Sequence, residues 1–552
     1  MPFLSRLLLT LLLMALPWVA RAKDSLIIGI SQYPATLHPA TEAMMAKSYV
    51  LGAALRPLTA YDSHWRLVCM LCETLPTLEN GLARRETTAD GKDGIALRYT
   101  LPASSFWADG TPVTSADALF TWDAGRHPKS GFANAEMYRR IVRLEVVDAK
   151  TFIIHLDRVT FDYNALNDFV LLPAHIERER FFADPAQYRT HTAYDQDSTN
   201  PGLYNGPYRI SETVQGSHVT LEPNPSWQGP RPAFKRVVVR VVENSAALEA
   251  QLLSGGIDMI AGELGVTLDQ AQALAKRKDR RFHIVYNPGL VFEHLDINHA
   301  SPILADRRVR QALLYGLDRS AINRDLFGGH QPVATTSVNP LDRVYTTDNV
   351  ALYPYDPAKA ARLLDEAGWT MTKSGRINTK GEPLTLELVT TAGSRARELV
   401  AQVIQSQWRR LGIDLKLRTE PPRVFFADTV SKRHYPHLAL FAWVSAPEGV
   451  PRTVLHSDQI PSEANSWSGQ NYAGYANPAM DKLLDATERE LNDSKRQALW
   501  RQIQQLYAED LPALPLFFRA EAHILPAGLS GLEPTGHQNP STLWIENWRW
   551  PR

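Results

Sequence analysis

Two stretches of the chain, far apart in sequence, each carry a strand–helix–strand pattern. The first consists of a Val-rich strand, a helix ended by a Gly-Gly pair, and a second strand, at residues 237–242, 245–254 and 257–261. Ser245 is the expected N-cap of this helix. The second begins with leucines that alternate with polar residues at 384–388, as in a strand. Apolar residues with helical spacing follow at 400–411 and end at Gly412, and a second alternating strand pattern lies at 413–417.

These two units predict two α/β lobes. A β-α-β crossover places its two strands in parallel and is almost always right-handed. Ligands of open α/β sheets bind outside the carboxyl ends of the strands, and pockets favour the interface between domains. The predicted strands at 26–30, 257–261 and 438–442 are followed by Tyr33, Glu263 and Trp443. We therefore expect these three side chains to line a cleft between the lobes.

The first 22 residues are typical of a cleaved secretory signal peptide. Arg6 precedes an apolar run at 7–16, and Ala20-Arg21-Ala22 follows as a cleavage site. The run is too short to span a bilayer, which needs about 20 residues. No Cys lies at the cleavage point, so a lipid anchor is not indicated. We expect a free periplasmic protein.

The charge balance argues against a nucleic-acid or anionic-membrane partner, since the chain has 59 basic and 59 acidic residues. The motifs of common enzyme classes are also missing. There is no G-x-S-x-G, H-E-x-x-H, G-x-x-x-x-G-K-S/T or G-x-G-x-x-G sequence. We expect no catalytic residue, no cofactor and no metal site.

The only two cysteines, Cys69 and Cys72, have the spacing C-x-x-C. A local disulfide is one interpretation, because the predicted compartment is oxidising. Two buried free thiols are the second. A metal site with His64 is the third, although a structural zinc usually takes four protein ligands.

One segment, at 106–122, combines a turn with a helix start. The sequence Asp109-Gly110-Thr111-Pro112 is typical of a turn. Thr114 is the expected N-cap of the helix that follows, and Asp117 places a carboxylate in its first turn. The sequence of this segment resembles the F-x-D-G-x-P-V-T-A-x-D motif of the family 5 extracellular solute-binding proteins. Further blocks similar to that family follow in its order, at 205–210, 224–227, 305–319, 355–369, 471–484 and 512–516.

The resemblance implies a bilobed periplasmic binding protein of type II, in the large peptide-binding class, with a third, extra domain. It implies a discontinuous lobe I at 23–57, 200–290 and 510–552, an extra domain at 58–199, and a lobe II at 291–509. The lobes are expected to close by a hinge near Pro288-Gly289. The implied role is capture of a peptide or peptide-like solute for an ABC permease in the inner membrane. We expect a monomer. A glycoside, an opine, or a chelated metal or haem is the alternative ligand.

The resemblance also implies ligand contacts. In peptide-binding members, an Asp after the cleft Trp holds the α-amino group of the ligand, because a buried cation needs a partner. Here Trp443 is followed by Val444-Ser445-Ala446-Pro447-Glu448, and that Asp is missing. Glu448 or Glu263 takes its place, or the ligand lacks a free amino terminus. The other candidate contacts are Tyr33, Phe292, His294, Ser445, Trp467 and Tyr472.

Overall fold

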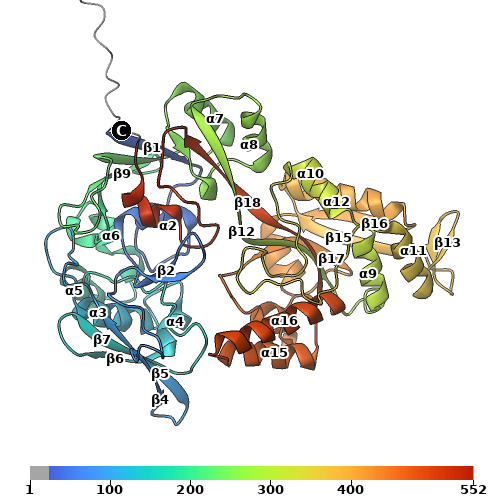
Figure 1. Ribbon diagram of the computed structural model, residues 1–552, viewed down its shortest axis with the longest axis horizontal. Helices are drawn as coiled ribbons and strands as arrows, with labels where there is room; N and C mark the ends of the chain where they lie inside the picture. The colour runs from blue at the N-terminus through green and yellow to red at the C-terminus, as the bar shows by residue number, and fades with distance from the viewer. Residues whose placement is uncertain (1–23, 466, 551–552) are drawn as a thin grey trace, which may run out of the picture.

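The computed structural model describes residues 24–465 and 467–550. The predicted signal peptide at 1–22 lies outside the described residues. The main feature is a ten-stranded sheet with the order β16-β15-β17-β12-β18-β11-β1-β10-β9-β8. Figure 1 shows two bodies, with the long strands β12 and β18 running from one to the other.

The first half of the sheet consists of β1 Ser25–Ile30, β8 Tyr208–Val214, β9 His218–Pro223, β10 Arg236–Val241 and β11 Met259–Ile260. Helices α2 Met45–Ala54, α7 Ser245–Ser254 and α8 Leu268–Ala275 accompany it. As predicted, β10 and β11 run parallel, but they are not neighbours, because β1 lies between them and pairs with both. The N-cap of α7 is Asn244 rather than Ser245, since the Asn244 side chain accepts the amide hydrogens of Ala246 and Ala247.

The second half consists of β15 Thr385–Thr391, β16 Asp414–Glu420 and β17 Leu438–Val444. Its principal helices are α9 Arg307–Tyr315, α10 Arg319–Phe327, α11 Pro357–Glu366, α12 Arg395–Arg409, α15 Pro478–Arg489 and α16 Asp493–Asp510. Shorter elements are β13 Thr370–Thr372, β14 Gly375–Ile377, α13 Pro422–Val424 and α14 Arg452–Leu455. The predicted β-α-β unit is present, with β15 and β16 parallel and adjacent.

Strands β12 Phe282–Ile297 and β18 Ala513–Pro526 form an antiparallel pair that joins the two halves. Residues 282–288 of β12 pair with 520–526 of β18, and residues 292–296 pair with 513–518. The register shifts between Pro288 and Phe292. Beyond that point, β12 takes β17 as its second neighbour. The predicted hinge at Pro288-Gly289 falls within this irregularity.

A separate four-stranded sheet has the order β4-β5-β7-β6. Its strands are β4 Ala83–Thr87, β5 Asp93–Thr100, β6 Ile141–Val146 and β7 Thr151–Leu156, with helices α3 Ser115–Arg126, α4 Ala135–Arg140, α5 Ala174–Ala183 and α6 Ala193–Gln196. Thr114 is the N-cap of α3, as predicted, and Asp117 of the first turn completes a capping box with it. Apolar residues of this region and of the first half of the main sheet form one continuous core cluster. A second large cluster fills the other body.

The region of the four-stranded sheet also touches the second body. The backbone N–H of Phe161 donates to the carbonyl of Glu488 at 2.9 Å. The guanidinium of Arg496 lies 5.0 Å from the centre of the Phe161 ring. A short hairpin of β2 Thr59–Tyr61 and β3 Leu67–Cys69 lies before the four-stranded sheet in sequence. Among the described residues, no helix combines the length and the apolar composition needed to cross a membrane.

Candidate functional site

A cavity of about 230 Å³ lies where β17 ends and the second part of β12 begins. Side chains at alternate positions of a strand share one face, and β12 presents Phe292, His294 and Asp296 to this space. Trp443, at the end of β17, contributes the facing aromatic wall. We call this space the Trp443 cavity. Its combination of aromatic surface with few polar groups is typical of small-ligand pockets.

Trp443 is half-buried and rests on other aromatic rings. Its ring centre lies 5.3 Å from that of Tyr472 and 5.5 Å from that of Phe441. Tyr472 packs against Trp443 but does not line the cavity, and its carbonyl accepts the Tyr435 hydroxyl at 3.0 Å. These contacts fix the orientation of the indole and leave part of its surface for a ligand.

His294 is buried and stacks on Phe292, with ring centres 5.0 Å apart and planes 5° apart. Burial lowers the pKa of His294 to about 4. Its imidazole is therefore neutral at physiological pH. Phe292 and His294, both predicted from sequence, thus supply a flat and uncharged wall to the cavity.

Asp296 is the functional candidate that sequence reasoning missed. It is 6% exposed, and its nearest polar partners are the Tyr435 hydroxyl at 3.4 Å and the His294 Nε2 at 3.8 Å. Burial raises the pKa of Asp296 to about 7. The strand alternation that links Phe292 and His294 extends to Asp296 and was the signal that could have found it.

A second carboxylate in the cavity wall, Asp342, already has partners. It accepts the backbone N–H of Val344 at 3.1 Å and that of Glu448 at 2.8 Å. Burial still raises the pKa of Asp342. Asp296 is therefore the carboxylate of this wall that has the weaker hydrogen bonding.

The two acids that the sequence offered as amine partners are both engaged elsewhere. Glu448 pairs with Arg343 and, at 3.2 Å, with Arg496, and it borders a different cavity of about 510 Å³. Glu263 accepts the backbone N–H of Ser541 at 3.2 Å and its hydroxyl at 2.9 Å. The Glu263 side chain is 2% exposed and lies outside the lining of the Trp443 cavity.

The other predicted contacts are divided. Ser445 lines the Trp443 cavity, and its N–H donates to the carbonyl of Leu290 at 3.4 Å. Tyr33 packs against the first core cluster, and burial raises its pKa. Trp467 makes an edge contact with His434 at 5.8 Å. Neither Tyr33 nor Trp467 belongs to the lining of the Trp443 cavity.

A larger cavity of about 680 Å³ lies next to the first and shares Val444 with it. Its walls come from α2, from the region of the four-stranded sheet and from the C-terminal segment, for example Met45, Asn134 and Pro540. The Val444 side chain is 68% exposed. The two cavities therefore adjoin at an exposed residue.

Two further polar features support the architecture. Buried Glu293, on the other face of β12, forms ion pairs with Arg397 of α12 at 3.1 Å and with Arg519 of β18. Burial opposes ionisation of Glu293, but the two guanidinium groups hold its pKa below the usual value. Cys69 and Cys72 are joined as a disulfide, the first of the three alternatives, with Cα atoms 5.4 Å apart.

Comparison with known proteins places this geometry in context. A family model described as bacterial extracellular solute-binding proteins, family 5 middle, matches residues 77–461. The oligopeptide-binding protein AppA of Bacillus subtilis is 26% identical over 494 residues, which cover 87% of this chain and 86% of that protein. The nickel-binding periplasmic protein of Escherichia coli is 24% identical over 431 residues, or 77% and 79% of the two chains.

A solved structure gives the same result for the fold. The oligopeptide-binding protein of Thermus thermophilus, complexed with a pentapeptide, superimposes with a TM-score of 0.70. It is 27% identical in sequence, and the match covers 96% of each chain. The predicted fold class, an α/β bilobed binding protein, is confirmed by this likeness.

Proposed function

Because this chain belongs to the bacterial extracellular solute-binding proteins of family 5, we propose that it captures a peptide or peptide-like solute for an ABC importer. The observation that carries the proposal is the pair of adjoining cavities that share exposed Val444. Their walls come from both bodies of the molecule, as a receptor that closes on its ligand requires. The names of the relatives that bind oligopeptides support the same ligand class.

The proposed domain limits are lobe I at 23–57, 200–290 and 510–552, the extra domain at 58–199, and lobe II at 291–509. The change of register between Pro288 and Phe292 supports a lobe boundary there. We propose that the protein works in the periplasm as a monomer, delivers its solute to an inner-membrane permease and catalyses no reaction.

Within the Trp443 cavity we propose a division of roles. Trp443, Phe292 and His294 pack against the ligand, and Asp296 pairs with its cationic amino group. Glu448 and Glu263 are less suited to that role, because other side chains of the protein already hold their carboxylates. A cation beside Asp296 would offset the cost of ionising a buried carboxylate.

The test is a ligand screen by thermal unfolding. Ligand that binds only the native state raises stability by RT ln(1 + [L]/Kd), about 2.7 kcal/mol at a hundredfold excess over Kd. We expect pentapeptides with a free amino terminus to raise the melting temperature more than their N-acetylated forms. Asp296→Asn should remove this difference, whereas Glu448→Gln, as the matched control, should retain it.

The screen also includes glycosides, opines and nickel chelates, because one relative is named for nickel binding. If a chelated metal alone shifts the melting temperature, the proposed peptide ligand is wrong. If peptides bind but acetylation has no effect, the ligand class stands and the role given to Asp296 is wrong.

A further inference from the structure

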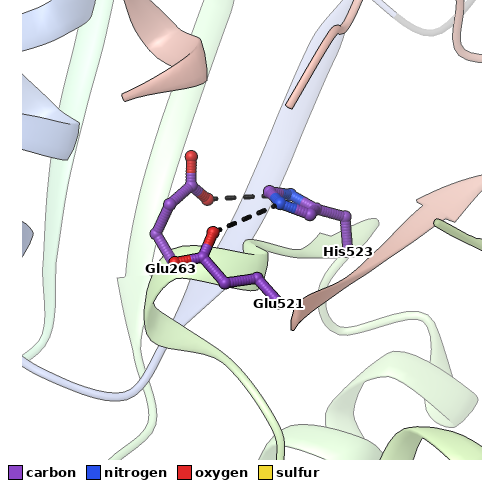
Figure 2. Close-up of side chains that lie close together, drawn as sticks. All are labelled: Glu263, Glu521 and His523. Atoms are coloured by element: carbon purple, nitrogen blue, oxygen red, sulfur yellow. Dashed lines mark ion pairs between the residues drawn. The ribbon is translucent and has the colours of Figure 1, made fainter. Parts of the chain in front are cut away.

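Away from the Trp443 cavity, three side chains from two segments converge on one point. Glu263 comes from the short helical turn Gly262–Leu264, and Glu521 and His523 come from alternate positions of β18. Figure 2 shows both carboxylates directed at the imidazole ring. One ligand atom from each residue lies within 4.8 Å of the other two. The closest approaches are 3.6 Å from Glu263 Oε2 to His523 Nδ1 and 3.7 Å from Glu521 Oε2 to His523 Nε2.

Three of these four atoms are buried and lack a hydrogen-bond partner. Glu263 Oε2, Glu521 Oε2 and His523 Nε2 are all unsatisfied. The Glu263 and His523 side chains are 2% and 1% exposed. Within residues 24–465 and 467–550, no Lys or Arg forms an ion pair with either carboxylate. A buried carboxylate oxygen without a hydrogen-bond partner is costly, so the cluster suits either a bound cation or a protonated His523.

We propose that Glu263, Glu521 and His523 bind a divalent transition-metal ion such as Zn²⁺. One imidazole with two carboxylates is a ligand set that suits Zn²⁺, and a water molecule can supply the fourth ligand. Ligand atoms around a tetrahedral Zn²⁺ lie roughly 3.3–3.6 Å apart. The 3.7 Å between Glu521 Oε2 and His523 Nε2 is close to that spacing. Glu263 Oε2 lies nearest to Nδ1, at 3.6 Å, and would turn toward Nε2 to share the ion.

Outer contacts hold the ligands in orientation. The N–H of Gly262 donates to His523 Nδ1 at 3.2 Å, which leaves Nε2 for the ion. Ser541 holds the other oxygen of Glu263. Glu521 is 29% exposed and gives the ion a path from solvent.

The site joins the turn at Glu263 to β18 and, through Ser541, to the C-terminal segment. It lies outside the linings of both cavities described above. Its role is therefore structural, and its existence does not depend on the ligand proposed for the Trp443 cavity. We expect metal binding to stabilise the fold and to leave the affinity for the solute unchanged.

The experiment uses the full chain without a histidine tag, stripped by chelator and titrated with Zn²⁺ by calorimetry. We expect one Zn²⁺ per chain and a higher melting temperature. Glu521→Gln and His523→Asn should each weaken binding at least tenfold. Asn retains an acceptor near the Nδ1 position for Gly262. The matched control is His434→Ala, which removes an exposed His that lies 3.4 Å from Asp428 and should bind as the wild type does.

Co²⁺ replacement supplies an independent readout, because its visible absorption reports the geometry of the ligands. A wild-type chain that takes up no stoichiometric Zn²⁺ would overturn the proposal and leave a protonated His523 as the cation. Equal Zn²⁺ affinity in wild type and Glu521→Gln would overturn it as well. Should His523→Asn fail to fold, the partly exposed Glu521→Gln variant still decides the question.

Discussion

The ionisation of Asp296 should impose a measurable pH dependence on the stability of the ligand-free protein. Its pKa is about 7 in the folded chain, against 3.8 for an ordinary Asp. Because the folded value is raised, the stabilisation is complete below pH 3.8 and is lost as the pH rises through 7. A difference of one in pKa corresponds to about 1.36 kcal/mol, so the total loss is about 4 kcal/mol. Between pH 5 and pH 8 the loss is about 3 kcal/mol.

Asp296→Asn removes this titration, because an amide does not ionise. We expect the variant to gain about 3 kcal/mol relative to wild type between pH 5 and pH 8. For a chain of this length, that gain corresponds to roughly 2–3 °C in melting temperature. The assay is thermal unfolding of both proteins at pH 5, 6, 7 and 8, without ligand. Taking the difference between the two proteins cancels the other titrating groups.

The control is Asp348→Asn, which changes a carboxylate that is 73% exposed and should show the same pH profile as wild type. If the difference between Asp296→Asn and wild type stays constant from pH 5 to pH 8, Asp296 is ionised throughout. This result would refute the conclusion that burial raises the pKa of Asp296. It would also refute the proposal that Asp296 pairs with the cationic group of the ligand.

Three further outcomes are expected. If the ligand cation pairs with Asp296, calorimetry should show affinity falling up to tenfold per pH unit below pH 7, and a flat profile would exclude the pair. Trp443→Ala should lower ligand affinity at least tenfold with the circular dichroism unchanged, because the indole is half-buried; unchanged affinity would remove it from the site. Glu293→Gln should cost about 3–5 kcal/mol in unfolding free energy, since it leaves two arginines without their buried partner, and a loss below about 1 kcal/mol would contradict this.

Features that depend on residues close together in the sequence, such as helix caps and β-α-β units, were the easiest to predict. The N-cap at Thr114 and the first-turn carboxylate of Asp117 appear in the structure as expected, and their spacing of three residues lets them form a capping box. The second β-α-β unit also appears with its two strands adjacent. The first unit does not, because β1 enters between β10 and β11. Hydrophobic periodicity identifies individual strands. It does not show that a strand from another part of the chain, here β1, lies between two of them in the sheet.

The lining of the Trp443 cavity was harder to predict, because the side chains that pair with its candidate residues come from distant parts of the chain. Glu263 follows the end of a strand, where a cleft residue is expected. Its carboxylate is nevertheless held by Ser541, which lies 278 positions later in the sequence. Glu448 follows Trp443 closely, yet Arg343 and Arg496 hold it beside another cavity. Asp296 was overlooked although its strand position follows directly from Phe292 and His294. A carboxylate in an apolar strand is a stronger sign of a site than an acid in a loop, because burial of the former is costly without a partner.

Strand β12 carries both the residues that face the Trp443 cavity and the irregular pairing between the two halves of the sheet. The residues of β12 that face the Trp443 cavity, Phe292, His294 and Asp296, follow directly after the register shift that begins at Pro288. On the opposite face, Glu293 ties this part of β12 to α12 and β18 through two ion pairs. These ion pairs hold β12 beyond Phe292, where its register with β18 shifts once more, between Glu293 and His294. Rotation between the lobes is therefore expected at Pro288 to Val291, where few ladder hydrogen bonds need to break. A ligand that packs against Phe292 would act on β12 one residue from that point, so binding and closure share a single element.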